Sequence, residues 1–93
     1  MDCNMLTWEI LVTGRVQGVG FRRYVQNCAR HSRIGGWTRN LRDGSVLIEA
    51  TGERQDLELF VELVRAGRGF IRVRGLSVNE LDNTIDYEDF SIR

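Results

Sequence analysis

The feature that most constrains this sequence is a glycine-rich run, GRVQGVGFR at residues 14–22, placed between segments of different hydrophobic period. Before it, the apolar residues Trp8, Ile10 and Val12 recur at every second position, which indicates a half-buried strand. After it, apolar residues recur at helical spacing, so we expect a helix over about residues 21–31. The chain must therefore pass from strand to helix through a short loop whose glycines can adopt backbone angles that other residues avoid.

The middle of the chain continues in short elements. We expect a second strand over residues 37–41, a hairpin turn at Asp43-Gly44 and a third strand over residues 46–50, where apolar residues again alternate. Gly52 is expected to break the chain after this strand.

A second helix follows, and its apolar stripe has i, i+3, i+4, i+7 spacing at Leu57, Phe60, Val61 and Val64. Gly67 is placed to end it. A fourth strand starts at residues 71–73, and a shift of its apolar phase at Gly75 indicates a bulge. Residues 80–87 read as a loop, and residues 90–92 as a short edge strand. The order β-α-β-β-α-β predicts an α+β, ferredoxin-like sandwich with two helices on one face of an antiparallel sheet.

Length and composition fit one folded domain, which we expect to span residues 1–93. Apolar residues make up 42% of the chain and charged residues 28%, which argues against disorder. The formal net charge is zero, so the molecule as a whole has no attraction to nucleic acid or to an anionic membrane.

The charges are unevenly distributed along the chain, and every basic residue is an arginine. Seven arginines and no acid lie between Glu9 and Asp43: Arg15, Arg22, Arg23, Arg30, Arg33, Arg39 and Arg42. Five acids and no base lie between Arg74 and Arg93: Glu80, Asp82, Asp86, Glu88 and Asp89. The first half of the chain could therefore attract a small anion, or its arginines could pair with the acidic tail.

The cysteines and the N-terminus limit the classes of protein to consider. Two cysteines, Cys3 and Cys28, do not make a disulfide framework, and Cys28 falls on the apolar side of the first helix. No Cys/His cluster suggests a metal, and no apolar run suggests a signal peptide or a membrane span. We therefore expect a cytoplasmic enzyme or binding module.

The glycine-rich run has the composition of an anion-binding loop. Successive backbone N–H groups can form a nest for an anion, and the N-terminus of the following helix adds partial positive charge. Arg22 lies at the start of that helix, where its planar guanidinium can reach phosphate oxygens. The alternative is an ordinary glycine-rich connection with an arginine on the surface.

Asn40 is the second candidate site residue. By period two it shares a face with Thr38, whereas Trp37 and Arg39 lie on the other face. Its carboxamide can accept a proton from water and donate to a phosphate oxygen at the same time. The alternative is an asparagine beside a turn that bonds its own backbone.

No side chain stands out as a general base. His31 is the only histidine, and it lies at the far end of the first helix, roughly 15 Å from the loop by helix rise. A phosphomonoester leaves as an alkoxide and needs an acid, whereas an acyl phosphate leaves as a carboxylate whose conjugate acid has a pKa near ~4. A site of anion donors and one amide suits the acyl phosphate better.

These residues carry a resemblance to a known family. GRVQGVGFR, followed by GWTRN, DGSV and Gly52, resembles the acylphosphatase family, and YEDFSIR is similar to the family's closing strand. The GVGFR form resembles bacterial or archaeal members more than animal ones. One departure is the run AGRGFIRV after the second helix, where the family usually has a Gly-Pro element and this chain has no proline.

The resemblance implies a ferredoxin-like fold and hydrolysis of acyl phosphates to carboxylate and inorganic phosphate, without metal or cofactor. It implies that Arg22 binds the phosphate and that Asn40 orients the attacking water. The loop whose N–H groups would hold the phosphate comprises Arg15, Val16, Gln17, Gly18, Val19, Gly20 and Phe21. Inorganic phosphate would inhibit as a product, and a monomer is the default expectation.

Two other functions remain open at this point. The first is a non-catalytic module of the same fold that binds phosphate or carbamoyl phosphate within a larger maturation protein; a chain no longer than one such domain favours the enzyme. The second is an RNA-binding domain, which would need an aromatic run on the third strand. That strand reads SVLIEA and has no aromatic residue. The sequence defines no pocket for the acyl group and does not name the physiological substrate.

Overall fold

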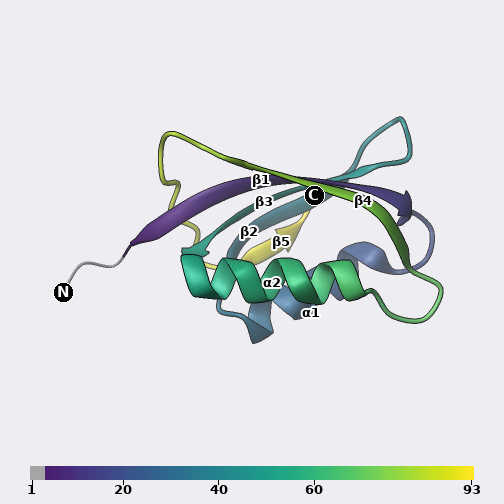
Figure 1. Cartoon of the computed structure of the whole chain (residues 1–93), viewed down its shortest axis with the longest axis horizontal. Helices are drawn as coiled ribbons and strands as arrows, with labels where there is room; N and C mark the ends of the chain where they lie inside the picture. The colour runs from purple at the N-terminus through teal and green to yellow at the C-terminus, as the bar shows by residue number, and fades with distance from the viewer. Residues whose placement is uncertain (1–3) are drawn as a thin grey trace.

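The computed structural model describes residues 4–93, which form a five-stranded sheet and two helices (Figure 1). In chain order the elements are β1 (Met5–Arg15), α1 (Phe21–His31), β2 (Gly35–Asn40), β3 (Val46–Glu53), α2 (Arg54–Ala66), β4 (Arg72–Glu80) and β5 (Phe90–Ile92). The predicted ferredoxin-like order is confirmed. Cys3 lies outside the described residues.

Both helices cover the same face of the sheet, the lower one in Figure 1. The periodicities explain why: the side chains at every second position of β1, Trp8, Ile10 and Val12, are all buried, whereas Leu11 between them is exposed. Each helix buries one stripe against this face, Phe21, Val25, Cys28 and Ala29 from α1 and Leu57, Phe60, Val61 and Val64 from α2. The core therefore lies between the sheet and the helix layer.

The strand order is β4-β1-β3-β2-β5, and the sheet is mixed. The first four strands pair antiparallel as expected, but β5 pairs parallel to β2, with Ile92 opposite Thr38. The reason is the path of the chain, which leaves β4 at one edge and crosses to the other edge before β5 begins. Buried hydroxyls hold this crossing segment: the amide of Ile85 donates to Thr7 Oγ1 at 2.8 Å, and Thr51 Oγ1 donates to the carbonyl of Ile85 at 2.6 Å.

The element boundaries expected from the sequence agree with the structure best for α1 and least for the strands. β1 and β3 are longer than expected, so Gly52 lies inside β3 opposite Leu6 and does not break the chain. A Cβ on Gly52 would lie 2.5 Å from Ile34 Cδ1, so the strand keeps glycine because a neighbouring side chain approaches it closely. The bulge in β4 is confirmed, because Thr13 pairs with Gly75 while Gly14 pairs with Val73.

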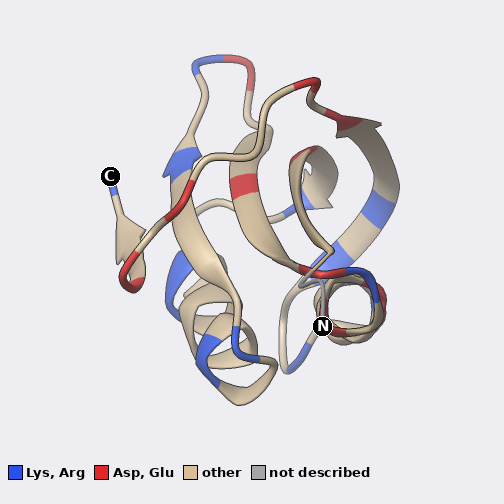
Figure 2. Cartoon of the chain, turned by 90° about the vertical axis from the view of Figure 1, so that its left-hand side faces the viewer, with Lys and Arg blue, Asp and Glu red and all other residues tan. Residues whose placement is uncertain are grey.

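The arginines of the first half do not pair with the acidic tail. Within residues 4–93, the one ion pair closer than 4.0 Å joins Arg54 and Glu80, at 3.4 Å. Figure 2 shows acidic stretches along the segment between β4 and β5, with arginines on the nearby helix that remain out of ion-pair reach. Neither helix in the described part of the chain has the length and apolarity that crossing a membrane requires.

The topology brings the ends of β1 and β2 and the starts of β3 and β4 together along one side of the sheet, the side at which these strands end or begin. β1 and β2 run in the same direction because both are antiparallel to β3, so Arg15 and Asn40 end their strands at the same edge. β3 and β4 begin there, with Val46 opposite Asn40 and Arg72 opposite Arg15. The glycine-rich loop and the hairpin turn are therefore neighbours, although they are far apart in the sequence.

Candidate active site

A cavity of about 210 Å³ opens where the glycine-rich loop meets the end of β2. Its lining combines the loop, the first turn of α1 and the last residues of two strands: Val16, Gly18, Gly20, Phe21, Arg22, Arg23, Asn40 and Ile92. Among these side chains the titratable ones are both arginines, so the cavity is cationic.

The loop takes its shape from glycine at two positions. Gly18 and Gly20 have φ angles of +73° and +78°, values that side chains other than glycine rarely adopt. A Cβ at either position would meet nothing within 4 Å, so the glycines are needed for backbone conformation and not for close packing.

The N-terminus of α1 is left open to a ligand. Gly20 is the N-cap residue, no side chain caps the helix, and its first turn contains no acidic residue. The first helical bond runs from the amide of Tyr24 to the carbonyl of Gly20, at 3.0 Å. The N–H groups of the preceding positions and the positive end of the helix dipole are therefore available to an anion in the cavity.

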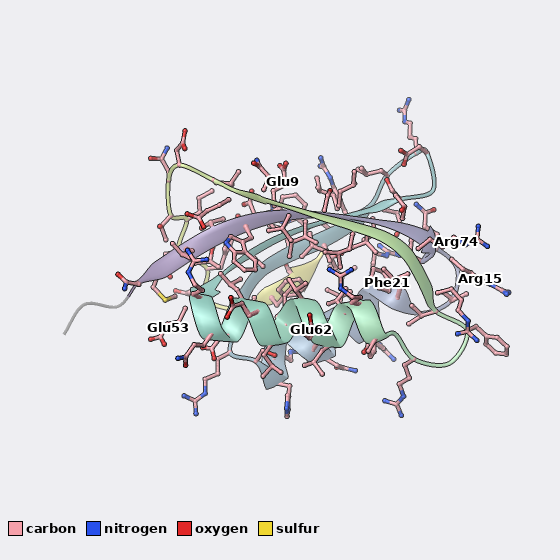
Figure 3. The ribbon with its side chains drawn as sticks, viewed as in Figure 1. Glu9, Arg15, Phe21, Glu53, Glu62 and Arg74 are labelled. Atoms are coloured by element: carbon pink, nitrogen blue, oxygen red, sulfur yellow. The ribbon has the colours of Figure 1, made fainter. Side chains whose placement is uncertain are left out.

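Two buried side chains fix the loop at its ends. Val16 and Phe21 are each 1% exposed and pack in the core, whereas the backbone between them borders the cavity. Figure 3 shows Phe21 on the helix side of the sheet and Arg15 at the end of the molecule, beyond the loop. The loop is thus anchored by the core and not by the surface.

Gln17 ties the loop to the hairpin. Its Nε2 donates to the carbonyl of Leu41 at 2.8 Å and to the carbonyl of Ser45 at 2.9 Å. The side chain therefore points away from the cavity and spans the gap between the loop after β1 and the turn after β2. Sequence reasoning placed Gln17 in the phosphate loop and had no signal for this contact, because it joins residues 24 and 28 positions apart.

Arg22 is half-buried in the first turn of α1 and lines the cavity. Its Nη1 makes one long contact with a described residue, 3.5 Å to the main-chain oxygen of Arg93. No Asp or Glu side chain within residues 4–93 pairs with it. Most of the donors of its guanidinium fork are therefore free for an anion.

Asn40 is the exposed last residue of β2, on the face it shares with buried Thr38. Within the described chain its side chain makes no hydrogen bond, so the structure does not contain the backbone-bonded asparagine that was the alternative. Asp43 performs that role, because its Oδ1 accepts from the amide of Ser45 at 3.0 Å. Asn40 and Arg22 line the same cavity, and the hydrogen-bonding groups of the Asn40 amide are unused within the described chain.

The remaining predicted loop side chains lie elsewhere. The guanidinium of Arg15 lies over the ring of Phe70, 5.8 Å from its centroid, and Val19 packs against the core and lines a neighbouring cavity. Two lining residues, Arg23 and Ile92, were not among the candidates. Arg23 could have been found beside Arg22, but Ile92 reaches the cavity only through the pairing of β5 with β2.

The ionisable groups near the site do not supply a base. His31 ends α1, at the opposite end of the helix from the cavity. Burial raises the pKa of Tyr24 to about 12, with a further contribution from the nearby Cys28, and burial also raises the pKa of Cys28. Both groups are therefore neutral at physiological pH, and neither lines the cavity.

Comparison with known proteins gives consistent results. The family model "Acylphosphatase" matches residues 8–92. An acylphosphatase of Bacillus velezensis is 42% identical over 88 residues, which is 95% of this chain and 98% of that one. The crystal structure of acylphosphatase from Bacillus subtilis superposes with a TM-score of 0.91 at 43% identity, covering 95% of this chain and 98% of the other.

A third similarity is to part of a much larger protein. The crystal structure of full-length HypF in its phosphate- and nucleotide-bound form matches all of this chain with a TM-score of 0.86 at 27% identity. The match covers 12% of that protein. The same fold therefore also occurs as one segment of a longer chain.

Proposed function

This chain belongs to the acylphosphatase family, and we propose that the cavity between the glycine-rich loop and Asn40 is where it hydrolyses acyl phosphates to a carboxylate and inorganic phosphate. One observation carries the assignment to this cavity. The cavity is lined by a helix N-terminus with free N–H groups, by an arginine that pairs with no Asp or Glu among residues 4–93, and by an asparagine whose amide has no partner there.

In this proposal the phosphoryl group binds to the backbone N–H groups of residues 15–21 and to Arg22. The guanidinium fork holds two phosphoryl oxygens, and the helix dipole adds to the positive potential. These interactions strengthen as the phosphoryl oxygens gain charge in the transition state, so they lower the barrier and do more than bind the substrate.

Asn40 holds the attacking water. Its amide oxygen accepts one water proton while its NH₂ group donates to a phosphoryl oxygen, which places the water oxygen in line with the bond that breaks. The water oxygen forms a bond to phosphorus, and the bond from phosphorus to the acyl oxygen breaks. The electron pair leaves with the carboxylate, and the water proton passes to a phosphoryl oxygen of the substrate. Catalysis is then positioning and electrostatics.

We also propose that the chain acts as a single acylphosphatase-like domain over residues 1–93, as a monomer in the cytoplasm, with inorganic phosphate as an inhibiting product. The comparisons with acylphosphatases over nearly their full length support the single-domain part of this proposal. The resemblance to a segment of HypF is the reason to test catalysis directly, because a binding module of this fold would hold phosphate without turnover.

The test is benzoyl phosphate hydrolysis by the wild type and by Arg22→Ala, with Arg30→Ala as the control because Arg30 lies exposed at the far end of α1. Loss of the charge-assisted clamp should cost about 3 kcal/mol or more of transition-state binding, which is a loss of more than about 100-fold in kcat/KM. Arg22→Lys should also be poor, because an ammonium cannot replace the fork. Near-normal turnover by a folded Arg22→Ala variant contradicts the proposal.

A further inference from the structure

A second cavity lies beside the first one. It measures about 280 Å³ and shares Gly20 and Arg23 with the active-site cavity, so the two cavities adjoin at the start of α1. Its other walls come from the far side of the glycine-rich loop, the next turn of α1 and the segment between α2 and β4, and include Val19, Tyr24, Asn27, Arg68 and Phe70. We call it the acyl cavity.

The acyl cavity lies on the side where in-line geometry requires the leaving group. The strand order is β4-β1-β3-β2, and the phosphate loop follows β1. Asn40 ends β2, on one side of this loop, whereas residues 67–71 lead into β4, on the other side. In an in-line displacement the attacking and leaving oxygens are on opposite sides of phosphorus. A water held by Asn40 therefore directs the acyl oxygen toward β4 and the acyl cavity.

An aromatic side chain is held at the mouth of this cavity. Phe70 is 74% exposed, more than any other large hydrophobic residue of residues 4–93. The guanidinium of Arg15 lies over its ring, and the turn that carries it is fixed by two hydrogen bonds from Arg72 Nη1, 2.7 Å to the carbonyl of Gly69 and 2.9 Å to that of Ile71. An exposed ring on a braced turn presents a flat apolar surface to a ligand.

The charge of the acyl cavity is positive. Arg23 and Arg68 line it, no acidic residue does, and neither arginine pairs with a carboxylate of the described chain. Arg15 and Arg74 project at the same end of the molecule (Figure 3). Tyr24 contributes no negative charge, because its hydroxyl donates to the carbonyl of Leu63 and its pKa is raised to about 12.

We propose that the acyl cavity binds the acyl part of the substrate, and that it favours an acyl group whose carbon skeleton packs on Phe70 and ends in a second carboxylate near Arg68. This inference rests on the proposed function, because it needs the phosphoryl group in the neighbouring cavity. It adds the substrate class: an acyl phosphate with two anionic ends. Arg23 lines both cavities.

Three kinds of substrate separate the contribution of the ring from that of the second carboxylate. Benzoyl phosphate and its 3- and 4-carboxy derivatives share a ring and differ in one carboxylate, whereas acetyl phosphate is too small to reach Phe70 or Arg68. The wild type should have a higher kcat/KM for at least one carboxybenzoyl phosphate than for benzoyl phosphate. Arg68→Gln should lower kcat/KM for that substrate about fivefold, through KM, and change the other two substrates less than about twofold.

Phe70→Ala should lower kcat/KM about fivefold for all the benzoyl substrates and leave acetyl phosphate unchanged. Arg65→Gln is the matched control, because Arg65 is exposed in the last turn of α2 and does not line the cavity. Both tested side chains are exposed, so the variants should fold, and thermal unfolding checks this directly.

The outcomes that overturn the inference differ from failure of the proposed function. Equal kcat/KM for the carboxylated and plain benzoyl substrates in the wild type, or an Arg68→Gln effect of the same size on both, overturns the second-anion specificity. An unchanged Phe70→Ala variant overturns the acyl cavity itself. In each of these cases acetyl phosphate is still hydrolysed, whereas a wild type that leaves acetyl phosphate intact contradicts the proposed function.

Discussion

At the scale of single residues, the proposed site divides binding and water positioning between two side chains of different chemistry. Arg22 comes from the first turn of a helix and Asn40 from the end of a strand, and both line the same cavity. Both could be found in the sequence because each has a local signal. Arg22 follows the glycine run directly, and the alternation of β2 places Asn40 on the helix-facing side with Thr38.

Removal of the Asn40 amide should separate binding from chemistry. In Asn40→Ala we expect kcat for benzoyl phosphate to fall about 100-fold, because the water is no longer held in line, while the inhibition constant of inorganic phosphate changes less than about threefold. Asn40→Asp should be as impaired or worse, because its carboxylate repels the phosphoryl oxygens.

The control for this pair is Asn79→Ala, an exposed asparagine on β4 near the other end of the sheet. If position 40 required a general base, Asp would be tolerated or would raise the rate. An active Asn40→Asp enzyme, or an Asn40→Ala variant that loses phosphate binding together with turnover, assigns the residue a different role.

At the scale of elements, Gln17 holds the loop after β1 against the hairpin turn after β2, and this contact sets the distance between the loop and Asn40. Gln17 bonds the carbonyls of Leu41 and Ser45, the two residues that close the hairpin through a 2.8 Å backbone hydrogen bond of their own. We expect Gln17→Ala to lower kcat about tenfold and to change the phosphate inhibition constant much less. It should also lower the free energy of unfolding by about 1–2 kcal/mol, because two carbonyls lose a donor.

Gln17→Glu distinguishes this positioning role from a purely structural one. A carboxylate cannot donate to either carbonyl, so kcat should fall at least as far as in Gln17→Ala, and the loss should diminish at low pH where the carboxyl group is protonated. Equal losses in kcat and in phosphate affinity would instead indicate that the loop itself has collapsed. Benzoyl phosphate kinetics between pH 4 and 8, with urea unfolding of each variant, provide the measurement.

The elements also show what a sequence can and cannot predict. The bounds of α1 could be predicted because its signals are local in the sequence. Gly20 precedes the helix, an apolar stripe runs along it, and the polar residues Arg30 and His31 end it. The position of Gly52 inside β3 could not be predicted, since it is visible only in the pairing with Leu6 of β1 and in the close approach of Ile34, from the connection between α1 and β2. The same holds for the Gln17 contact, and for Ile92, which reaches the site through parallel pairing with β2. Contacts between residues far apart in the sequence leave no local sequence pattern from which they could be predicted.

At the scale of the whole molecule, a single hydroxyl connects the two helices of the covering layer. The hydroxyl of Tyr24, on α1, donates to the carbonyl of Leu63, on α2, and burial raises its pKa to about 12. The folded state therefore disfavours the phenolate relative to the unfolded state. This contribution to stability is complete below about pH 10, the ordinary tyrosine pKa, and is lost as the pH rises through 12.

Alkaline stability should therefore depend on Tyr24. We expect the free energy of unfolding of the wild type to fall between pH 9 and 12, and the fall to be smaller in Tyr24→Phe, which is about 1 kcal/mol less stable at pH 8 for lack of the hydrogen bond. Part of the fall should remain, because burial also raises the pKa of Cys28. Urea unfolding across this range measures both effects, and identical slopes for the two proteins would exclude Tyr24 as the cause.

The distribution of charge over the whole molecule predicts how the protein responds to its product. The net charge is zero, yet the cavity that we assign to the phosphoryl group is lined by arginines and by an uncapped helix N-terminus. Inorganic phosphate should therefore inhibit competitively and raise the melting temperature, since it binds the folded state alone. EDTA should change neither the activity nor the melting temperature, because residues 4–93 contain no cluster of three or more side chains suited to hold a metal ion. Thermal unfolding with and without phosphate, in wild type and Arg22→Ala, measures this directly. A phosphate shift that survives in Arg22→Ala, or activity lost on chelation and restored by a divalent ion, would require a different anion site or a different mechanism.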